Sequence, residues 1–158
     1  MTKYFLGLCL LASCTFGFAE QPTWYFVRHF EKQLGDNPSL TETGKFRAQA
    51  LAAFFSDKSL HHVYSTDYHR TLETATPVVE LKNVDIQSYD PSNLVEFATK
   101  LKTLDHVLVV GHSNTTPELL DLMGGEKINI EENDYGVVYI LQKNGRELTT
   151  QFIHIPLE

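Results

Sequence analysis

Cysteine and positive charge are both scarce in this sequence. Its only cysteines, Cys9 and Cys14, both precede residue 20. A chain that begins at Glu20 would have no thiol, which excludes disulfides, cysteine nucleophiles and zinc-thiolate sites. The 13 Lys and Arg residues stand against 20 Asp and Glu residues, so the formal net charge is -7. This balance argues against general binding to nucleic acid or to anionic membranes.

The first 19 residues have the pattern of a secretory leader. Lys3 precedes an apolar stretch, residues 4–18, that is too short to span a bilayer, and small residues stand at positions -3 and -1 before Glu20. Cleavage after Ala19 predicts a periplasmic or secreted protein in which residues 20–158 form a single domain. The alternative is a lipobox at residues 11–14, with Cys14 as a lipidated membrane anchor. Cleavage is favoured because the apolar stretch continues past Cys14.

The remaining sequence alternates strand-like and helix-like segments. Apolar runs predict strands at 23–28, 62–65, 85–88 and 106–110, and helical periodicity predicts helices at 42–56, 70–81, 91–104 and from Thr116-Pro117 to Gly124-Gly125. Thr41 is the expected N-cap of the first helix, and Pro77 is expected to kink the second or to begin a new turn.

The last part of the chain predicts a hairpin. Asn144-Gly145 lies between the apolar segments 137–142 and 148–155, which is a strong signal for an antiparallel pair of strands. The expected fold is therefore a three-layer α/β/α sandwich with a mostly parallel central sheet and a C-terminal antiparallel hairpin at its edge.

Two of the predicted strands end at a histidine. Arg28-His29 follows the apolar run 24–27, and Gly111-His112 follows the run 107–110. Ligands of open α/β sheets bind at the carboxyl ends of the strands, so these residues predict a cationic pocket for an anion, with phosphate the first candidate. Arg70 is expected at the start of a helix, where a cation opposes the helix dipole, and this conflict favours an anion nearby.

Phosphoryl transfer from a monoester needs charge neutralisation, a nucleophile and a proton for the leaving oxygen. Arg28 and Arg70 are predicted to bind the phosphate oxygens in fork geometry, with a further donor from His112 and an auxiliary contribution from Ser113. His29 remains as the nucleophile. A histidine attacks through a neutral ring nitrogen, so the other nitrogen should donate to a carbonyl or a side chain. No cofactor is required.

Two carboxylates are candidates for the general acid. Asp90 follows a predicted strand at the same sheet edge, and Glu31 lies two residues beyond His29. Asp90 is preferred because a carboxylate across the pocket can reach the leaving group, whereas Glu31 is better explained as the salt-bridge partner of a nearby base. Asp90 is equally well explained as an ordinary turn residue or helix cap before Pro91.

Five further histidines are assigned structural or surface roles, because no pair has the spacing of a helical metal site with a third ligand nearby: His61, His62, His69, His106 and His154.

Together these fragments resemble the histidine phosphatase superfamily, also called phosphoglycerate mutase-like. The motifs are Arg28-His29, residues 40–44 (LTETG), residues 65–70 (STDYHR) with 73–75 (ETA), and residues 111–113 (GHS). The resemblance spans most of the chain after the leader. The small size is most similar to a short bacterial branch that includes protein phosphohistidine phosphatases.

The resemblance implies a phosphohistidine intermediate on His29, a phosphate pocket formed by Arg28, Arg70 and His112, and no metal. The chain departs from the family pattern at Phe30, where the family has glycine. This departure predicts a pocket of altered shape beside His29.

The sequence therefore predicts a metal-independent phosphatase that acts on phosphomonoesters or phosphohistidine. The expected substrate is a phosphorylated small molecule or a phosphoprotein, with no nucleic-acid partner and no membrane partner unless Cys14 is lipidated. A non-catalytic phosphate-binding or sensing module on the same fold is the main alternative. A phosphomutase is less favoured, as is a serine hydrolase around Ser113, because Thr115 stands where its elbow needs glycine.

Overall fold

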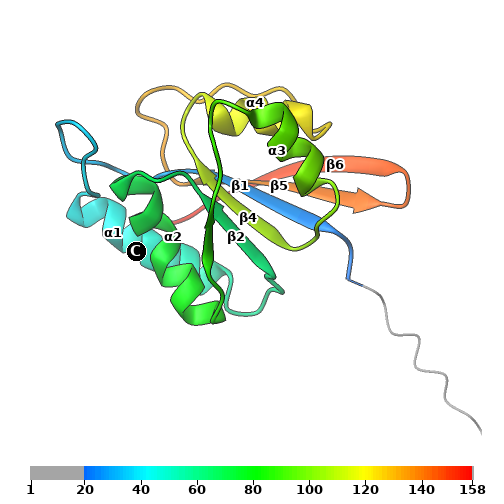
Figure 1. Cartoon of the computed structure of the whole chain (residues 1–158). Helices are drawn as coiled ribbons and strands as arrows, with labels where there is room; N and C mark the ends of the chain where they lie inside the picture. Colours follow the sequence, from blue (N-terminus) through cyan, green and yellow to red (C-terminus); the bar gives the residue numbers. More distant parts are fainter. Residues whose placement is uncertain (1–19, 158) are drawn as a thin grey trace, which may run out of the picture.

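The apolar segments of the chain form a six-stranded sheet that helices cover on both faces (Figure 1). The computed structural model describes residues 20–157, and the predicted leader, residues 1–19, lies outside them. The elements in chain order are β1 (Thr23–Arg28), α1 (Glu42–Phe54), β2 (His62–Ser65), α2 (His69–Lys82), β3 (Ile86–Ser88), α3 (Leu94–Leu101), β4 (Val107–Gly111), α4 (Thr115–Leu122), β5 (Val137–Asn144) and β6 (Glu147–His154). None of the helices in this part of the chain has the length and apolar character needed to cross a bilayer.

The strand order is β3-β2-β4-β1-β5-β6. The first four strands in this order are parallel, whereas β5 runs antiparallel to β1 and β6 antiparallel to β5. Every residue of β1 and of β4 is buried, which explains why both segments are continuous apolar runs in the sequence. The predicted sheet with its C-terminal antiparallel hairpin is confirmed.

Two apolar cores lie on opposite faces of the sheet. Helices α1 and α2 cover one face, where Leu51 packs in the same cluster as Val27, and α3 and α4 cover the other, where Phe97 packs with Phe26 (Figure 1). Val27 and Phe26 are neighbours in β1, and successive strand residues point to opposite faces. One strand therefore supplies both cores and lies between the two helical layers.

Two helix predictions differ from the structure at their starts, and a third differs in the helix interior. The segment predicted as a helix from residue 91 begins only at Leu94, because the Asp90 carboxylate accepts a hydrogen bond from the Ser92 backbone N–H at 2.8 Å and forms a turn. Helix α4 begins at Thr115, earlier than the predicted cap and proline. Helix α2 continues through Pro77 without interruption.

The hairpin turn lies one residue later than predicted. Asn144 pairs with Glu147, so the two turn residues are Gly145 and Arg146. Gly145 has a φ of 63°, which glycine adopts without the steric cost of a side chain.

Candidate active site

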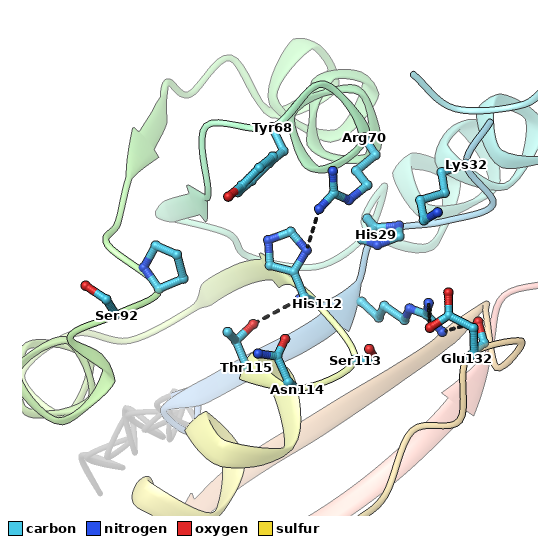
Figure 2. Close-up of a pocket in the computed structure, with 12 residues that line it drawn as sticks. His29, Lys32, Tyr68, Arg70, Ser92, His112, Ser113, Asn114, Thr115 and Glu132 are labelled. Atoms are coloured by element: carbon cyan, nitrogen blue, oxygen red, sulfur yellow. Dashed lines mark hydrogen bonds and ion pairs between the residues drawn. The ribbon is translucent and has the colours of Figure 1, made fainter. Parts of the chain in front are cut away.

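The carboxyl ends of β1 and β4 bring the two predicted histidines together. Arg28 is paired with Gly111 across the two strands, and the His29 backbone N–H donates to the Gly111 carbonyl at 2.9 Å. The rings of His29 and His112 are consequently 5.6 Å apart, centroid to centroid, in an edge-to-face arrangement. Figure 2 shows both rings at the base of an open pocket, with Arg70 above them.

The hydrogen bonds of His29 define the ring nitrogen that is free to react. Its Nδ1 lies 2.8 Å from the Phe30 carbonyl oxygen, which can only accept, so Nδ1 carries the proton and Nε2 has a free lone pair. Burial lowers the pKa of His29 to about 3, opposed by the Phe30 carbonyl and reinforced by the charges of Arg28 and Arg70. The ring is therefore neutral at pH 7, as a nucleophile requires.

The Phe30 side chain does not narrow the pocket. It is fully buried in the core that α1 covers and is not among the residues that line the pocket. Its backbone N–H donates to the Thr74 hydroxyl at 3.1 Å, while its carbonyl holds His29. The altered pocket shape that the sequence predicted at this position therefore does not arise from the phenyl ring.

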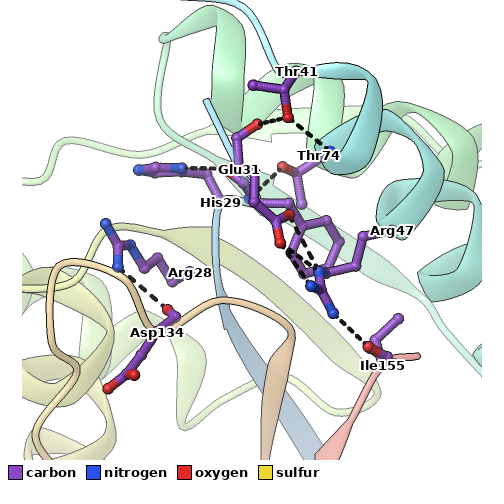
Figure 3. A network of polar contacts seen from close by, with 10 residues as sticks. Arg28, His29, Glu31, Thr41, Arg47, Thr74, Asp134 and Ile155 are labelled. Atoms are coloured by element: carbon purple, nitrogen blue, oxygen red, sulfur yellow. Dashed lines mark hydrogen bonds and ion pairs between the residues drawn. The ribbon is translucent and has the colours of Figure 1, made fainter. Parts of the chain in front are cut away.

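A network of polar contacts fixes the chain immediately behind His29 (Figure 3). The Glu31 carboxylate pairs with Arg47 at 2.6 Å, and the Glu31 carbonyl accepts from the Thr41 N–H at 2.8 Å. Thr41 in turn caps α1 by accepting from the Gly44 N–H at 3.1 Å, which agrees with the predicted cap. Glu31 is thus the salt-bridge partner of Arg47, and it does not line the pocket.

His112 is held in the opposite tautomer to His29. Arg70 Nη2 lies 3.4 Å from His112 Nδ1, and a guanidinium can only donate, so Nδ1 is the acceptor and Nε2 carries the proton. That Nε2–H donates to the Thr66 hydroxyl at 2.9 Å. Thr66 is also 3.0 Å from the Thr71 hydroxyl, which donates to a backbone carbonyl. Burial, and then the charges of Arg70 and Arg28, lower the pKa of His112 to about 4.

Part of the Arg28 guanidinium is bound by other groups of the protein. Its Nη1 donates to the backbone carbonyls of Glu131 and Glu132 at 2.8 Å, and its guanidinium lies 4.3 Å from the centre of the Tyr135 ring. Its Nη2 lies 3.8 Å from the Glu132 carboxylate. Arg28 was expected to bind two phosphate oxygens at once. This capacity is reduced, because its Nη1 already anchors the segment before β5.

Among the residues that the structure describes, Arg70 has no carboxylate partner. It lies in the first turn of α2 with its guanidinium 4.4 Å from the centre of the Tyr68 ring, and no acidic side chain of residues 20–157 pairs with it. The Nε atoms of Arg70 and Arg28 are both buried without an acceptor in the same part of the chain. Burial, together with the charge of Arg28, lowers the pKa of the Arg70 guanidinium. Buried charges in proteins are normally paired, so the Arg70 guanidinium is suited to bind an anionic ligand.

Most predicted site residues line the pocket, but Asp90 does not. Its carboxylate is exposed and accepts hydrogen bonds from the Ser92 hydroxyl at 2.7 Å and the Ser92 N–H, contacts that lower the pKa of Asp90. The pocket is lined by the neighbouring Pro91 and Ser92 instead. The expectation that Asp90 reaches the leaving group is not met, because its carboxylate is bound by Ser92 and does not line the pocket.

Sequence reasoning did not find several residues of the pocket. Lys32 and Tyr68 line it, and Glu132 supplies the carboxylate at its rim. Lys32 follows the Arg28-His29 motif closely, and Tyr68 lies within the motif at residues 65–70. Their closeness in sequence to these motifs could have identified both. Glu132 belongs to an irregular segment whose position depends on Arg28, and no sequence periodicity indicates it.

Ser113, predicted as an auxiliary anion contact, lines the pocket just before α4, and its neighbour Asn114 lines it as well. Asn114 is in the cap position without a side-chain cap bond. The arrangement combines a neutral nucleophilic nitrogen with unpaired cationic donors, which is the requirement for binding and attacking a phosphoryl group.

Solved structures of several phosphatases share this fold. An Escherichia coli protein provisionally assigned as an alpha-ribazole-5'-P phosphatase has a TM-score of 0.70 at 16% identity, covering 85% of this chain and 97% of that one. The protein histidine phosphatase SixA, in complex with tungstate, has a TM-score of 0.65 at 14% identity, covering 83% and 94%. A mycobacterial glucosyl-3-phosphoglycerate phosphatase has a TM-score of 0.62 at 11% identity, covering 85% and 98%. No curated protein sequence matches this chain significantly.

The family comparison agrees with the fold. The profile of the histidine phosphatase superfamily, branch 1, matches residues 24–99, which contain Arg28, His29 and Arg70. The expectation of a histidine-phosphatase-type enzyme is confirmed at this level. Residues 24–99 of the chain, which carry Arg28, His29 and Arg70, therefore match the histidine phosphatase superfamily.

Proposed function

We propose that this protein is a metal-independent phosphatase that acts through a phosphohistidine intermediate on His29. The observation that carries the proposal is the setting of Arg70, a cation without a carboxylate partner within residues 20–157, in the pocket that also contains the neutral His29 ring. A phosphoryl group supplies the missing negative charge to Arg70, and its phosphorus then lies in reach of His29.

In the first step the lone pair of His29 Nε2 attacks phosphorus as the bond to the leaving oxygen breaks. The Phe30 carbonyl accepts from Nδ1–H and stabilises the charge that develops on the ring. The leaving oxygen takes a proton and departs as an alcohol. In the second step water attacks phosphorus, the P–N bond breaks, and phosphate leaves with His29 neutral again.

Glu132 is the proposed proton donor for the leaving group. Within residues 20–157 it is the one carboxylate that lines the pocket, and its position 3.8 Å from Arg28 places it beside the anion site. Its side chain is 75% exposed, so it can exchange protons with solvent between turnovers.

Metal independence is supported by the side chains that line the pocket. Arg28, Lys32 and Arg70 place positive charge around the reacting position, whereas Glu132 is one carboxylate at the rim. These three positive side chains repel a divalent metal ion. They also neutralise the phosphate charge, which a metal would otherwise do.

The substrate class is a phosphorylated small molecule or a phosphoprotein. The similar structures named above include a provisionally assigned alpha-ribazole-5'-P phosphatase, a protein histidine phosphatase and a glucosyl-3-phosphoglycerate phosphatase, so this fold accommodates quite different leaving groups. The leader pattern at residues 1–19 supports a periplasmic or secreted location, and mass spectrometry that finds Glu20 as the first residue would exclude an anchor on Cys14.

Hydrolysis of an aryl phosphate by purified protein lacking the leader, with and without chelator, tests this function. His29→Ala should lower turnover by about 10³-fold or more, because no other group replaces the nucleophile. His69→Ala is the matched control, since His69 is exposed and does not line the pocket. Acid-labile phosphorylation of the native chain, absent from His29→Ala, should be detected by mass spectrometry after rapid quenching.

Full activity of His29→Ala, or loss of activity with chelator while the protein stays folded, would contradict the mechanism. Tungstate binding without turnover of any ester in a broad panel would instead support the alternative of a phosphate-binding module. Tungstate is a suitable probe because the SixA structure holds it.

A further inference from the structure

A second cluster of chemistry-bearing side chains lies at the edge of the sheet opposite the phosphate pocket. His61 precedes β2, and Asp105 and His106 precede β4. Because β2 and β4 are parallel neighbours, the segments that lead into them are adjacent (Figure 1). One ligand atom from each of these three residues lies within 4.8 Å of the other two.

Two of the three separations between these atoms are close to those in a tetrahedral metal site. His61 Nδ1 lies 3.0 Å from Asp105 Oδ1, and His106 Nδ1 lies 3.6 Å from the same oxygen. Ligands bonded to Zn²⁺ at about 2.0–2.1 Å in a tetrahedron are about 3.3 Å apart, and the two distances bracket that value. An ion could therefore bind with only small movements of two exposed side chains.

His106 gives independent support, because its ring is buried and unsatisfied. Its side chain is 5% exposed, and within residues 20–157 neither ring nitrogen has a hydrogen-bond partner. Buried imidazole nitrogens are normally paired, so an unpaired ring beside a histidine and a carboxylate calls for a ligand. The backbone holds this ring in place at a positive φ of 51°, and the His106 carbonyl accepts from the His61 N–H at 2.8 Å.

The outer partner of a metal-bound histidine is also present. His106 Nε2 lies 3.5 Å from the Glu20 carboxylate, on the ring nitrogen that does not face Asp105. Histidines that bind metal through one nitrogen usually donate the other N–H to a carboxylate or carbonyl, which orients the ring. Glu20 would perform this role while connecting the start of β1 to the site.

We propose that His61, Asp105 and His106 form a binding site for a zinc-class divalent transition-metal ion. Two imidazoles and one carboxylate are a ligand set that suits Zn²⁺ and not Mg²⁺, which prefers oxygen ligands and water. The site is structural: it ties the segments before β2 and β4 together, and it lies at the opposite ends of the strands from His29. The ion takes no part in phosphoryl transfer.

Calorimetric titration of the untagged protein, residues 20–158, with ZnCl₂ tests the site. We expect one ion per chain, a rise in melting temperature with Zn²⁺ and none with Mg²⁺. His61→Ala and Asp105→Asn should each weaken Zn²⁺ binding by at least 10-fold. Both side chains are about half exposed, so these variants should fold normally. His154→Ala, an exposed histidine of β6, is the matched control and should bind Zn²⁺ as the native protein does.

Absence of Zn²⁺ binding, or equal binding by the native protein and both site variants, would overturn the proposal. Nitrogen NMR adds a local readout, since coordination should shift the Nδ1 resonances of His61 and His106 and leave that of His154 unchanged. Phosphatase activity of His61→Ala should equal that of the native protein, which separates this site from the phosphate pocket.

Discussion

The rings of His29 and His112 meet edge to face at 5.6 Å in opposite tautomers. His29 is protonated on Nδ1 because the Phe30 carbonyl accepts there, and His112 is protonated on Nε2 because Arg70 donates to its Nδ1. The unprotonated nitrogen is therefore Nε2 in His29 and Nδ1 in His112. His29 offers Nε2 for attack, whereas His112 becomes a donor from Nδ1 only when it gains a proton.

Nitrogen NMR of the free protein should show these two tautomers directly. Long-range ¹H–¹⁵N spectra at pH 7 should report Nδ1–H for His29 and Nε2–H for His112. Both rings should remain neutral at pH 5, since burial holds their pKa values at about 3 and about 4. The same tautomer on both rings, or a pKa near the ordinary histidine value of about 6.5, would contradict the assigned hydrogen bonds.

Stability should fall in acid because these buried rings resist protonation. The pKa of each ring is lowered in the folded protein, so below about pH 6.5 the unfolded chain binds more protons than the native one. Stability is therefore full above about pH 6.5 and declines as the pH falls towards the folded values. Between pH 6.5 and 4.5 we expect His29 alone to contribute a loss of about 1–3 kcal/mol.

Urea unfolding at pH 7, 5.5 and 4.5 measures this loss. His29→Asn removes the titrating group and should show a smaller decline over the same range. Equal declines in the native protein and His29→Asn would show that other groups cause the acid sensitivity.

Thr66 is predicted to act as a positioning residue for His112. Thr66→Val removes the acceptor for His112 Nε2–H, so the ring loses its fixed tautomer and orientation. We expect tungstate affinity to fall about 10-fold, equivalent to about 1.4 kcal/mol, as for a buried hydrogen bond to an active-site ring. Thr66→Ser keeps the hydroxyl and should restore most of the affinity. Failure of serine to restore it would indicate a packing effect alone.

The sequence predicted the part of the site that depends on the sheet. His29 and His112 follow runs buried on both faces, and carboxyl ends of neighbouring parallel strands share one edge, so their meeting followed from β1 and β4 alone. Glu132 could not be found this way. Its segment has no periodicity, and it is positioned by backbone carbonyls that bind Arg28.

The role of Asp90 was also ambiguous in the sequence, because it depends on a contact that only the structure shows. A short polar residue before proline is compatible with a free acid or with a closed turn, and the choice depends on the bond to the Ser92 N–H. The cluster of His61 and His106 was also invisible in the sequence, because 45 positions separate them until β2 pairs with β4.

Glu132 and Asp90 can be distinguished by the leaving group. Glu132→Gln should slow hydrolysis of an alkyl phosphate by about 10²-fold, because an alkoxide needs a proton to depart. The same variant should hydrolyse p-nitrophenyl phosphate within about threefold of the native rate, since that leaving group is stable as an anion. Asp90→Asn should leave both rates unchanged, because its carboxylate lies outside the pocket. A selective loss with alkyl esters in Asp90→Asn would instead restore Asp90 as the acid.

Gly44 should be intolerant of alanine although it lies in a helix. Alanine is favoured over glycine in a helix interior by about 1 kcal/mol. A Cβ at Gly44, however, would lie 2.3 Å from the Glu31 carbonyl oxygen, a backbone atom that Thr41 also binds. The steric cost exceeds the helix preference, so we expect Gly44→Ala to lose about 1–3 kcal/mol. Urea unfolding followed by the fluorescence of the buried Trp24 measures this change.

The exposed position Gln49 in the same helix provides the control, and Gln49→Ala should change stability by no more than about 0.5 kcal/mol. The clash also has a consequence for activity. Glu31 directly follows Phe30, whose carbonyl fixes the His29 tautomer, so a displaced Glu31 backbone misaligns the nucleophile. Folded Gly44→Ala should therefore show a lower kcat with little change in KM. A variant as stable and as active as the native protein would show that the start of α1 can move away from Glu31 without disturbing His29.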